Sequence, residues 1–168
     1  MQIIKNFLPE EQYKKIKQFI FSEKFPWFYN KDTVYRDPLE ILNKEQEIGQ
    51  FIHFFYKDYY SDSPFINIIS PFIEKINPIS IFRIKLNLNY GTKKIIETGY
   101  HTDIDDKRFK SAVFFLNECD GYCKIKEEKI YSEDNKVVIF DSNTSHTGST
   151  CTSSKRRVVL NMVYIDVK

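Results

Sequence analysis

The second half of the chain is a succession of short apolar segments separated by turns, and this pattern constrains the fold most. Residues 79–90 alternate between apolar and polar side chains, and this period of two indicates a half-buried strand. Further short apolar runs follow, one of them after the turn signal Asp120-Gly121. Short strands that follow one another in this way favour an antiparallel barrel or sandwich. The expected strands span residues 79–90, a segment around His101, and residues 111–117, 122–126, 129–132, 137–140 and 156–166.

The first half is predicted to be mainly helical. Apolar residues recur at helical spacing in residues 9–22, 48–59 and 64–76. Pro9 and Pro64 suit the first turn of a helix, where a missing backbone N–H costs no hydrogen bond. We expect these helices to lie against one face of the sheet. Residues 3–8 are expected to form an edge strand, residues 25–29 a loop or strand, and residues 30–43 a polar loop and candidate lid.

Helices followed by many short strands predict the α+β class. The 168 residues suffice for one domain with a real core. We therefore predict a single domain, with helical support in residues 1–78 and a strand-rich core in residues 79–168.

Composition and charge argue against several classes of protein. The formal net charge of +2 is too small to predict a nucleic-acid partner. No apolar run is long enough to span a membrane, and the N-terminus lacks the layout of a signal peptide, so a cytoplasmic location is expected. Three cysteines, an odd number, favour reduced thiols over a disulfide framework.

Two of the three histidines fall near one acidic residue in the strand-rich region. His101 and Asp103 are two residues apart, a spacing that points both side chains the same way on a strand. His146 follows the strand predicted at 137–140 and supplies a third ligand from a distant part of the chain. We predict that the three side chains bind one metal ion. The alternative is that His101 and Asp103 form a surface hydrogen-bonded pair and that His146 is a loop histidine.

The ligand set also indicates which metal would be bound. Two imidazoles and one carboxylate on one face of an octahedron leave three open positions, which suits non-haem Fe(II) oxygenases. A tetrahedral zinc site with three protein ligands leaves only one.

A basic pair, Arg156-Arg157, opens the last predicted strand. A guanidinium matches a planar carboxylate with two parallel hydrogen bonds. We interpret one of the two as the cation that holds an acidic co-substrate beside the metal and the other as a solvent-exposed cation, and the doubling alone leaves both assignments open. If Arg156 faces inward, Val158, Leu160 and Met162 share its face. If Arg157 faces inward, Val159 and Asn161 share its face, because side chains alternate along a strand.

The strand before His101 carries four polar residues on one side. Either Asn87 and Asn89 or Arg83 and Lys85 are candidates to line the pocket and bond the co-substrate. The alternative is that all four form the exposed face of a half-buried strand. The remaining histidine, His53, has no ligand partner at a matching spacing and is predicted to be structural.

This order of motifs resembles that of the Fe(II)/2-oxoglutarate-dependent dioxygenases, in particular the small prolyl-4-hydroxylase-like members of phage and marine microbial sequences. The family pattern combines a His-x-Asp, a strand ending in Leu-Asn, a Gly turn, an Asn before an apolar strand, a distal His and a basic residue about ten positions on. The matching residues here are His101-Thr102-Asp103, Leu116-Asn117, Asp120-Gly121-Tyr122, Asn135, Val138-Ile139-Phe140-Asp141, His146 and Arg157-Val158-Val159-Leu160-Asn161.

The resemblance extends over residues 83–164 and implies a double-stranded β-helix (jelly-roll) core. It carries the iron ligands onto His101, Asp103 and His146, and the carboxylate clamp onto Arg157, where strict prolyl hydroxylases have lysine. It further implies Fe(II), 2-oxoglutarate and O2, with ascorbate as a supporting reductant. The implied reaction is hydroxylation of an amino-acid, peptidyl or small-metabolite C–H bond, with release of succinate and CO2.

Other functions fit the same residues. One is a cupin-like metal-dependent hydrolase or isomerase, and another is a non-catalytic jelly-roll binding module. Arg157 favours the oxygenase, because a hydrolase needs no buried carboxylate clamp. A nucleic-acid demethylase ranks low, because 23 acidic residues offset the basic clusters. The expected partner is therefore a small-molecule or peptidyl substrate.

Overall fold

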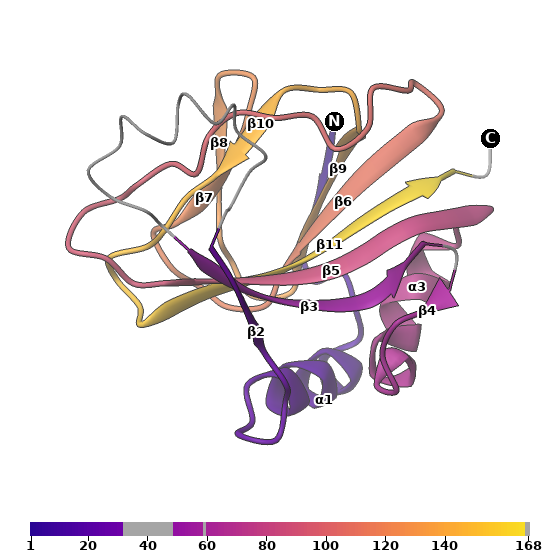
Figure 1. The fold of residues 1–168 in the computed structure, drawn as a ribbon, viewed down its shortest axis with the longest axis horizontal. Coiled ribbons are helices and arrows are strands. Elements are labelled where there is room, and N and C mark those ends of the chain that lie inside the picture. The colour runs from indigo at the N-terminus through magenta and orange to yellow at the C-terminus, as the bar shows by residue number, and fades with distance from the viewer. Residues whose placement is uncertain (32–48, 59, 167–168) are drawn as a thin grey trace.

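The computed structural model describes residues 1–31, 49–58 and 60–166. Two sheets form its core (Figure 1). The larger has the strand order β1-β9-β6-β11-β5-β3-β2, with β4 paired to β3, and the smaller has the order β10-β7-β8. Every strand pair in both sheets is antiparallel. The strands are β1 (Gln2–Ile4), β2 (Phe28–Asn30), β3 (Gln50–Lys57), β4 (Tyr60–Ser61), β5 (Ser80–Tyr90), β6 (Phe109–Phe115), β7 (Tyr122–Ile125), β8 (Glu128–Tyr131), β9 (Lys136–Asp141), β10 (His146–Gly148) and β11 (Arg156–Ile165).

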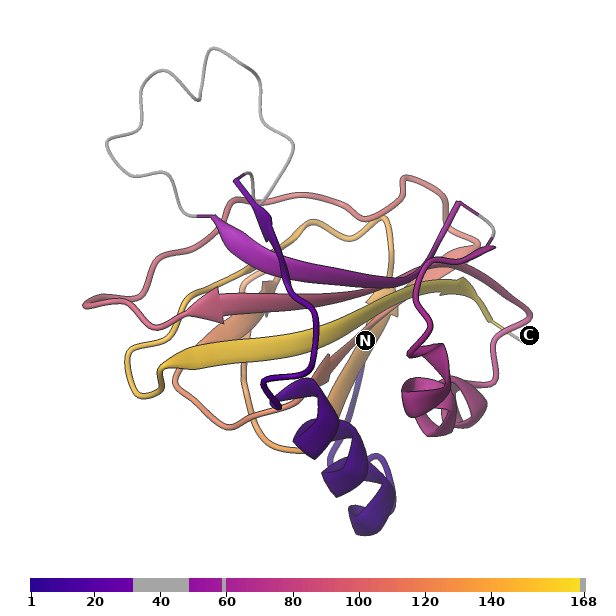
Figure 2. The ribbon, with the colours of Figure 1, turned by 60° about the horizontal axis from the view of Figure 1, so that its bottom comes forward.

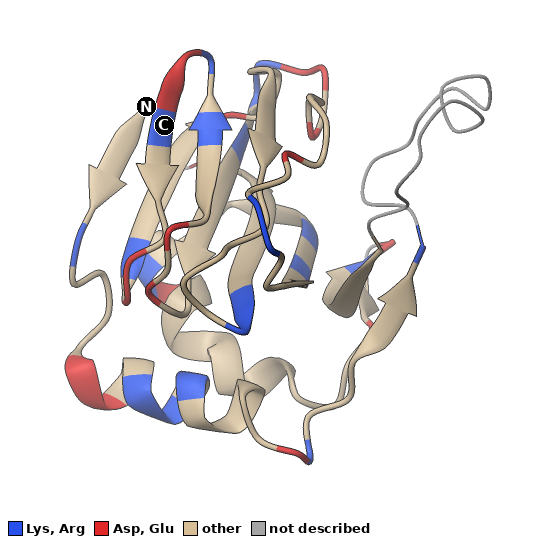
Figure 3. Ribbon diagram, turned by 90° about the vertical axis from the view of Figure 1, so that its left-hand side faces the viewer, with Lys and Arg blue, Asp and Glu red and all other residues tan. Residues whose placement is uncertain are grey.

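A helical layer covers one face of the large sheet. It consists of α1 (Glu10–Ile20), the 3-10 helix η1 (Ile66–Ile69) and α3 (Ser70–Ile76), and Figure 2 shows α1 and α3 on the same side of the strands. The helix α1 begins with acids and continues with basic residues (Figure 3), which suits the helix dipole. Its buried residues join a core that includes Phe72, Phe114 and Leu160. The predicted packing of helices on one sheet face is confirmed for the segments predicted at residues 9–22 and 64–76.

A second, smaller core fills the space between the two sheets. It contains Val113 and Phe115 from β6, Val159 from β11, and residues of β7, β8 and β9. Because side chains alternate along a strand, β11 contributes Val158 and Leu160 to the helical side and Val159 to the inter-sheet side. The large sheet is therefore covered on both faces, and the inter-sheet side carries the candidate site.

The prediction of a helix at residues 48–59 is wrong. Residues 50–57 form β3, which pairs with β2 on one side and β5 on the other. The sequence Phe51-Ile52-His53-Phe54-Phe55 is a continuous run of residues that favour strands, and its spacing fits either structure. The first half of the chain thus supplies strands as well as helices.

Apart from the segment around His101, described below, the other predicted helices and strands agree in kind with the structure, with shifted ends. The helical segment predicted from Pro64 begins at Ile66 as η1 and continues as α3. Residues 3–8 contribute only the short edge strand β1, which pairs with β9. Of the predicted loop 30–43, residues 32–43 lie outside the described residues. No helix in the described part of the chain is both long and apolar enough to cross a membrane.

Candidate metal centre

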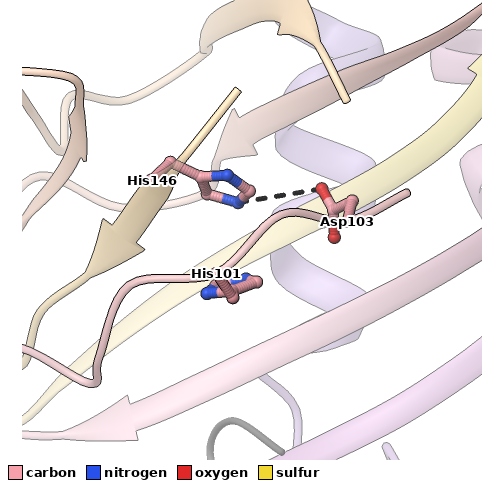
Figure 4. A group of neighbouring side chains, drawn as sticks. All are labelled: His101, Asp103 and His146. Atoms are coloured by element: carbon pink, nitrogen blue, oxygen red, sulfur yellow. Dashed lines mark ion pairs between the residues drawn. The ribbon is translucent and has the colours of Figure 1, made fainter. Parts of the chain in front are cut away.

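The structure brings together the three side chains that the sequence singled out. His101, Asp103 and His146 each offer a ligand atom, and these atoms all lie within 4.8 Å of one another. His146 Nε2 is 3.7 Å from Asp103 Oδ2. Figure 4 shows the three side chains converging, with His146 carried by β10 and the other two by the loop after β5. This spacing allows all three to share one ion.

Backbone pairing places the two histidines side by side. The N–H of His101 donates to the carbonyl of His146 at 2.9 Å, and the N–H of His146 donates back at 2.9 Å. The prediction of a strand around His101 is wrong, because that segment is a loop, and His101 pairs with His146 of β10 as an isolated bridge. The N–H of Asp103 donates to the carbonyl of Ser142 at 3.0 Å and fixes the loop again two residues later.

Each imidazole is oriented by a carbonyl two residues before it. The Nδ1 of His101 is 3.3 Å from the Gly99 carbonyl oxygen, and the Nδ1 of His146 is 3.0 Å from the Thr144 carbonyl oxygen. A carbonyl only accepts, so Nδ1 carries the proton in both rings and Nε2 keeps its lone pair. Burial, and then the neighbouring His146, lowers the pKa of His101 and favours the neutral, metal-binding form.

Asp103 is held by three polar side chains of the large sheet. Its carboxylate accepts from Arg83 at 2.5 Å, from the Ser111 hydroxyl at 2.6 Å and from the Asn161 amide at 3.4 Å. Burial opposes ionisation, but the Arg83 guanidinium, together with His146 and Ser111, outweighs it, so the pKa of Asp103 lies below its usual value. Asp103 is therefore a fixed carboxylate beside the two imidazoles.

Arg157 points into the space between the sheets and Arg156 points out. The side chain of Arg157 is buried, with 3 % exposure, and its Nε donates to the Ser132 hydroxyl at 2.8 Å. Among the described residues, no acidic side chain pairs with its guanidinium, and burial lowers its pKa. Arg156 is exposed and stacks 4.6 Å from the ring centre of Phe21 on the helical side. The predicted inward direction of Arg157 is confirmed.

The polar residues of β5 face the same space. Asn89 lies opposite Arg157 in the register and Asn87 lies opposite Val159. Each has a buried Oδ1 with no hydrogen-bond partner in the described structure, although Asn89 Nδ2 donates to the Ser149 carbonyl at 3.2 Å. Buried polar atoms without partners are rare, so these two oxygens are candidate contacts for a ligand. By alternation Arg83 and Lys85 share this face, so both sequence alternatives lie on it.

Sequence reasoning missed the residues that support the site. Ser111 and Asn161 hold Asp103, and Ser132 holds Arg157. Gly121 was recognised only as a turn residue, yet a Cβ there would lie 2.6 Å from Arg157 Cδ. Serine, asparagine and glycine are common in any chain, and only the strand pairing shows which of them meet the site. The Gly turn between predicted strands was the one available signal.

Comparisons with known proteins identify the fold. No protein-family model and no curated protein matches the sequence. Solved structures do match. The alpha-ketoglutarate-dependent epimerase SnoN from nogalamycin biosynthesis has a TM-score of 0.65 and 10% identity over 98% of this chain and 77% of its own. A Pseudomonas putida prolyl-4-hydroxylase has a TM-score of 0.59 and 14% identity, over 98% and 91% of the two chains.

A prolyl hydroxylase from Trichoplax adhaerens, bound to a hypoxia inducible factor peptide, has a TM-score of 0.61 and 13% identity, over 98% and 83% of the two chains. SnoN was also solved with Fe3+, alpha-ketoglutarate and nogalamycin RO. The chain thus shares the fold of these three enzymes along nearly its whole length. The predicted α+β fold with a double-stranded β-helix core is confirmed.

Proposed function

We propose that the protein is an Fe(II)/2-oxoglutarate-dependent dioxygenase, with His101, Asp103 and His146 as iron ligands and Arg157 as the co-substrate clamp. The observation that carries the proposal is the buried Arg157, which has no acidic partner in the described structure. An isolated buried charge is costly, and a carboxylate supplied by a ligand removes that cost. The three ligands would leave three positions open on an octahedral ion.

The register of β11 supports this arrangement. Asn161 bonds the proposed ligand Asp103 and lies four residues beyond Arg157 on the same face of β11. Four residues of strand span about 13 Å. A five-carbon diacid and the long arginine side chain together suit that separation. Asn87 and Asn89 are opposite this stretch and are proposed to contact the co-substrate through their unpartnered oxygens.

The protein's own groups orient the reactants, and the bound cofactors supply the oxidation. With iron, 2-oxoglutarate and O2 bound, the chemistry expected is oxidation of a substrate C–H bond with release of succinate and CO2. Arg157 would fix the far carboxylate of 2-oxoglutarate. Gly99 and Thr144 hold the imidazole rings, and Arg83 and Ser111 hold the carboxylate. Hydroxylation of an amino-acid, peptidyl or small-metabolite substrate is the reaction we propose.

Succinate formation from 2-oxoglutarate with Fe(II), ascorbate and O2 tests this proposal. Because a structural neighbour is an epimerase, consumption of 2-oxoglutarate is a better readout than a hydroxylated product. His101→Ala and His146→Ala are expected to abolish metal binding and reduce succinate formation to background. His53→Gln is the matched histidine control, because His53 lies outside the centre, and it is expected to keep metal binding and turnover.

Two results would contradict the proposal. Activity that needs no O2 and is supported by Zn²⁺ would favour the metal-dependent hydrolase or isomerase. Metal binding without any 2-oxoglutarate binding would favour a binding module. In the second case Arg157 would need a different ligand.

A further inference from the structure

A second cation without an acidic partner, Lys85, lies on the same face of the large sheet as the centre. Its cross-strand neighbours are Phe54 on β3 and Asn161 on β11. Its side chain is half-buried, and no described acidic side chain forms an ion pair with its ammonium group. Burial, and then the neighbouring Arg83, lowers the pKa of Lys85 to about 8. The function proposed above leaves this cation without a role.

The charges on this face do not balance. The four central strands β3, β5, β6 and β11 contain no acidic residue, and Asp103 is already paired with Arg83. One carboxylate of the co-substrate would pair with Arg157, and the other would offset one of the two charges of a divalent ion. One positive charge of the ion and that of Lys85 would then remain as excess. A site with this excess favours a substrate that is itself an anion.

The direction of Lys85 separates it from the co-substrate clamp. Its Nζ lies 5.9 Å from the ring centre of Phe54, so the ammonium leans toward β3 and away from β11, which carries Arg157. The ring of Phe54 is half-buried and also has Lys57 Nζ 5.0 Å from its centre. The β3 side of the site therefore combines an apolar ring with positive charge.

We propose that Lys85 binds a carboxylate of the prime substrate while Phe54 packs against its carbon skeleton, so that the substrate is a small organic acid. This inference rests on the proposed oxygenase function and adds the class of substrate to it. A carboxylate at Lys85 would form a charge-assisted hydrogen bond and would hold the rest of the molecule over the metal.

The experiment compares free amino acids and simple carboxylic acids with their matched neutral amides. Each compound is added to the Zn²⁺-loaded protein with 2-oxoglutarate for a thermal-shift measurement, and to the Fe(II) protein for succinate formation. Wild type is expected to respond to one or more acids and not to the matching amides. Lys85→Met is expected to weaken the response to those acids at least about tenfold, as loss of a charged hydrogen bond does.

Control variants separate this role from general damage. Lys85→Arg keeps the charge and is expected to restore part of the acid response. Lys14→Gln removes a lysine charge on the outer side of helix α1, where the side chain is 71% exposed, and is expected to behave as wild type. Affinity for 2-oxoglutarate itself is expected to be unchanged in Lys85→Met.

Three results would overturn the inference: an equal response of wild type to acids and amides, no response to any acid, or a loss of 2-oxoglutarate affinity in Lys85→Met. The last would move Lys85 to the co-substrate. Failure of the oxygenase proposal is seen separately, because the thermal shift with 2-oxoglutarate alone reports co-substrate binding without turnover.

Discussion

Arg157 is buried at an energetic cost that no described acidic side chain offsets. Its guanidinium is buried, contacts the Ser132 hydroxyl and the Ser149 carbonyl, and lies 5.6 Å from the ring centre of Phe115. These neutral contacts replace water only in part, and they leave the charge uncompensated. If position 157 served packing alone, an apolar residue of similar size would give a more stable fold than arginine does. This difference gives a test that distinguishes binding from stability.

We expect Arg157→Met to leave the metal-free protein as stable as wild type, or more stable by up to about 4 kcal/mol, as other buried charges do when replaced by apolar residues. The same variant is expected to weaken 2-oxoglutarate binding at least about 30-fold, since truncating one partner of a buried charge pair costs 2 kcal/mol or more. Chemical denaturation and calorimetric titration measure the two effects.

The neighbouring Arg156→Met serves as the matched control. Arg156 points to the opposite face of the sheet and stacks on Phe21, so its removal is expected to leave 2-oxoglutarate affinity unchanged. Severe destabilisation by Arg157→Met, with 2-oxoglutarate binding retained, would make the buried guanidinium a structural residue.

At the residue scale, chemical identity decided what the sequence could predict. His101, Asp103 and His146 were singled out because few residue types bind metals and their order along the chain is informative, and the structure gathers them. Their support was not predictable, because Ser111 and Asn161 meet Asp103 only through the pairing of β6 and β11. The role of the three ligands stays a prediction until metal binding is measured.

At the element scale, β3 shows where spacing alone misleads. The buried residues Gln50, His53 and Phe55 of β3 do not follow a simple alternation, and a register irregularity falls between Phe54 and Tyr56. Such a strand imitates helical spacing in sequence. Strands with regular alternation, such as β5, were predicted within one residue at their start. Local pattern therefore identifies a strand well where apolar and polar residues alternate in its sequence.

His53 ties β3 to two other segments. Its Nδ1 lies 2.9 Å from the Pro26 carbonyl oxygen, which can only accept, so Nδ1 donates and Nε2 accepts from the Ser63 hydroxyl at 2.8 Å. Burial lowers the pKa of His53 below its ordinary value of 6.5. Its position among Phe25, Phe55 and Phe65, away from the three proposed ligands, agrees with the structural role predicted for it.

The lowered pKa gives a pH-dependence of stability with a definite sign. As the pH falls below about 6.5, the unfolded chain takes up a proton at residue 53 before the folded chain does, so stability present above this pH is lost. One such proton gives a slope of at most about 1.4 kcal/mol per pH unit. Denaturation of wild type and His53→Gln between pH 7 and pH 5 is expected to show the shallower slope in the variant.

The pKa of His101 is also lowered, but His101 is present in both proteins, so its effect on the slope cancels in the comparison. Parallel slopes for wild type and His53→Gln would show that His53 titrates alike in the folded and unfolded chains.

At the scale of the whole molecule, the candidate centre joins the two sheets. His146 belongs to β10 of the small sheet, whereas Asp103 is held by Arg83 on β5, Ser111 on β6 and Asn161 on β11 of the large sheet. The small sheet has only three strands, which pair over four residues or fewer. A metal ion shared by His146 and Asp103 would therefore add a strong link between the large sheet and β10, which pairs with β7 over only three residues.

Metal binding is accordingly expected to stabilise one region more than others. Zn²⁺ serves as a redox-inactive probe. It is expected to raise the melting temperature of the protein, because it binds the folded centre and not the unfolded chain, and a chelator is expected to reverse this increase. Amide hydrogen exchange should slow most in residues 99–104 and in β10, and least in α1, which packs on the far face of the large sheet.

The control variant Asp103→Asn keeps the shape of the side chain and removes its charge, so it is expected to abolish most of the increase in melting temperature and most of the protection from exchange. Protection spread evenly over the molecule, or retained in Asp103→Asn, would mean that the ion binds elsewhere and that the two sheets are held together by packing alone.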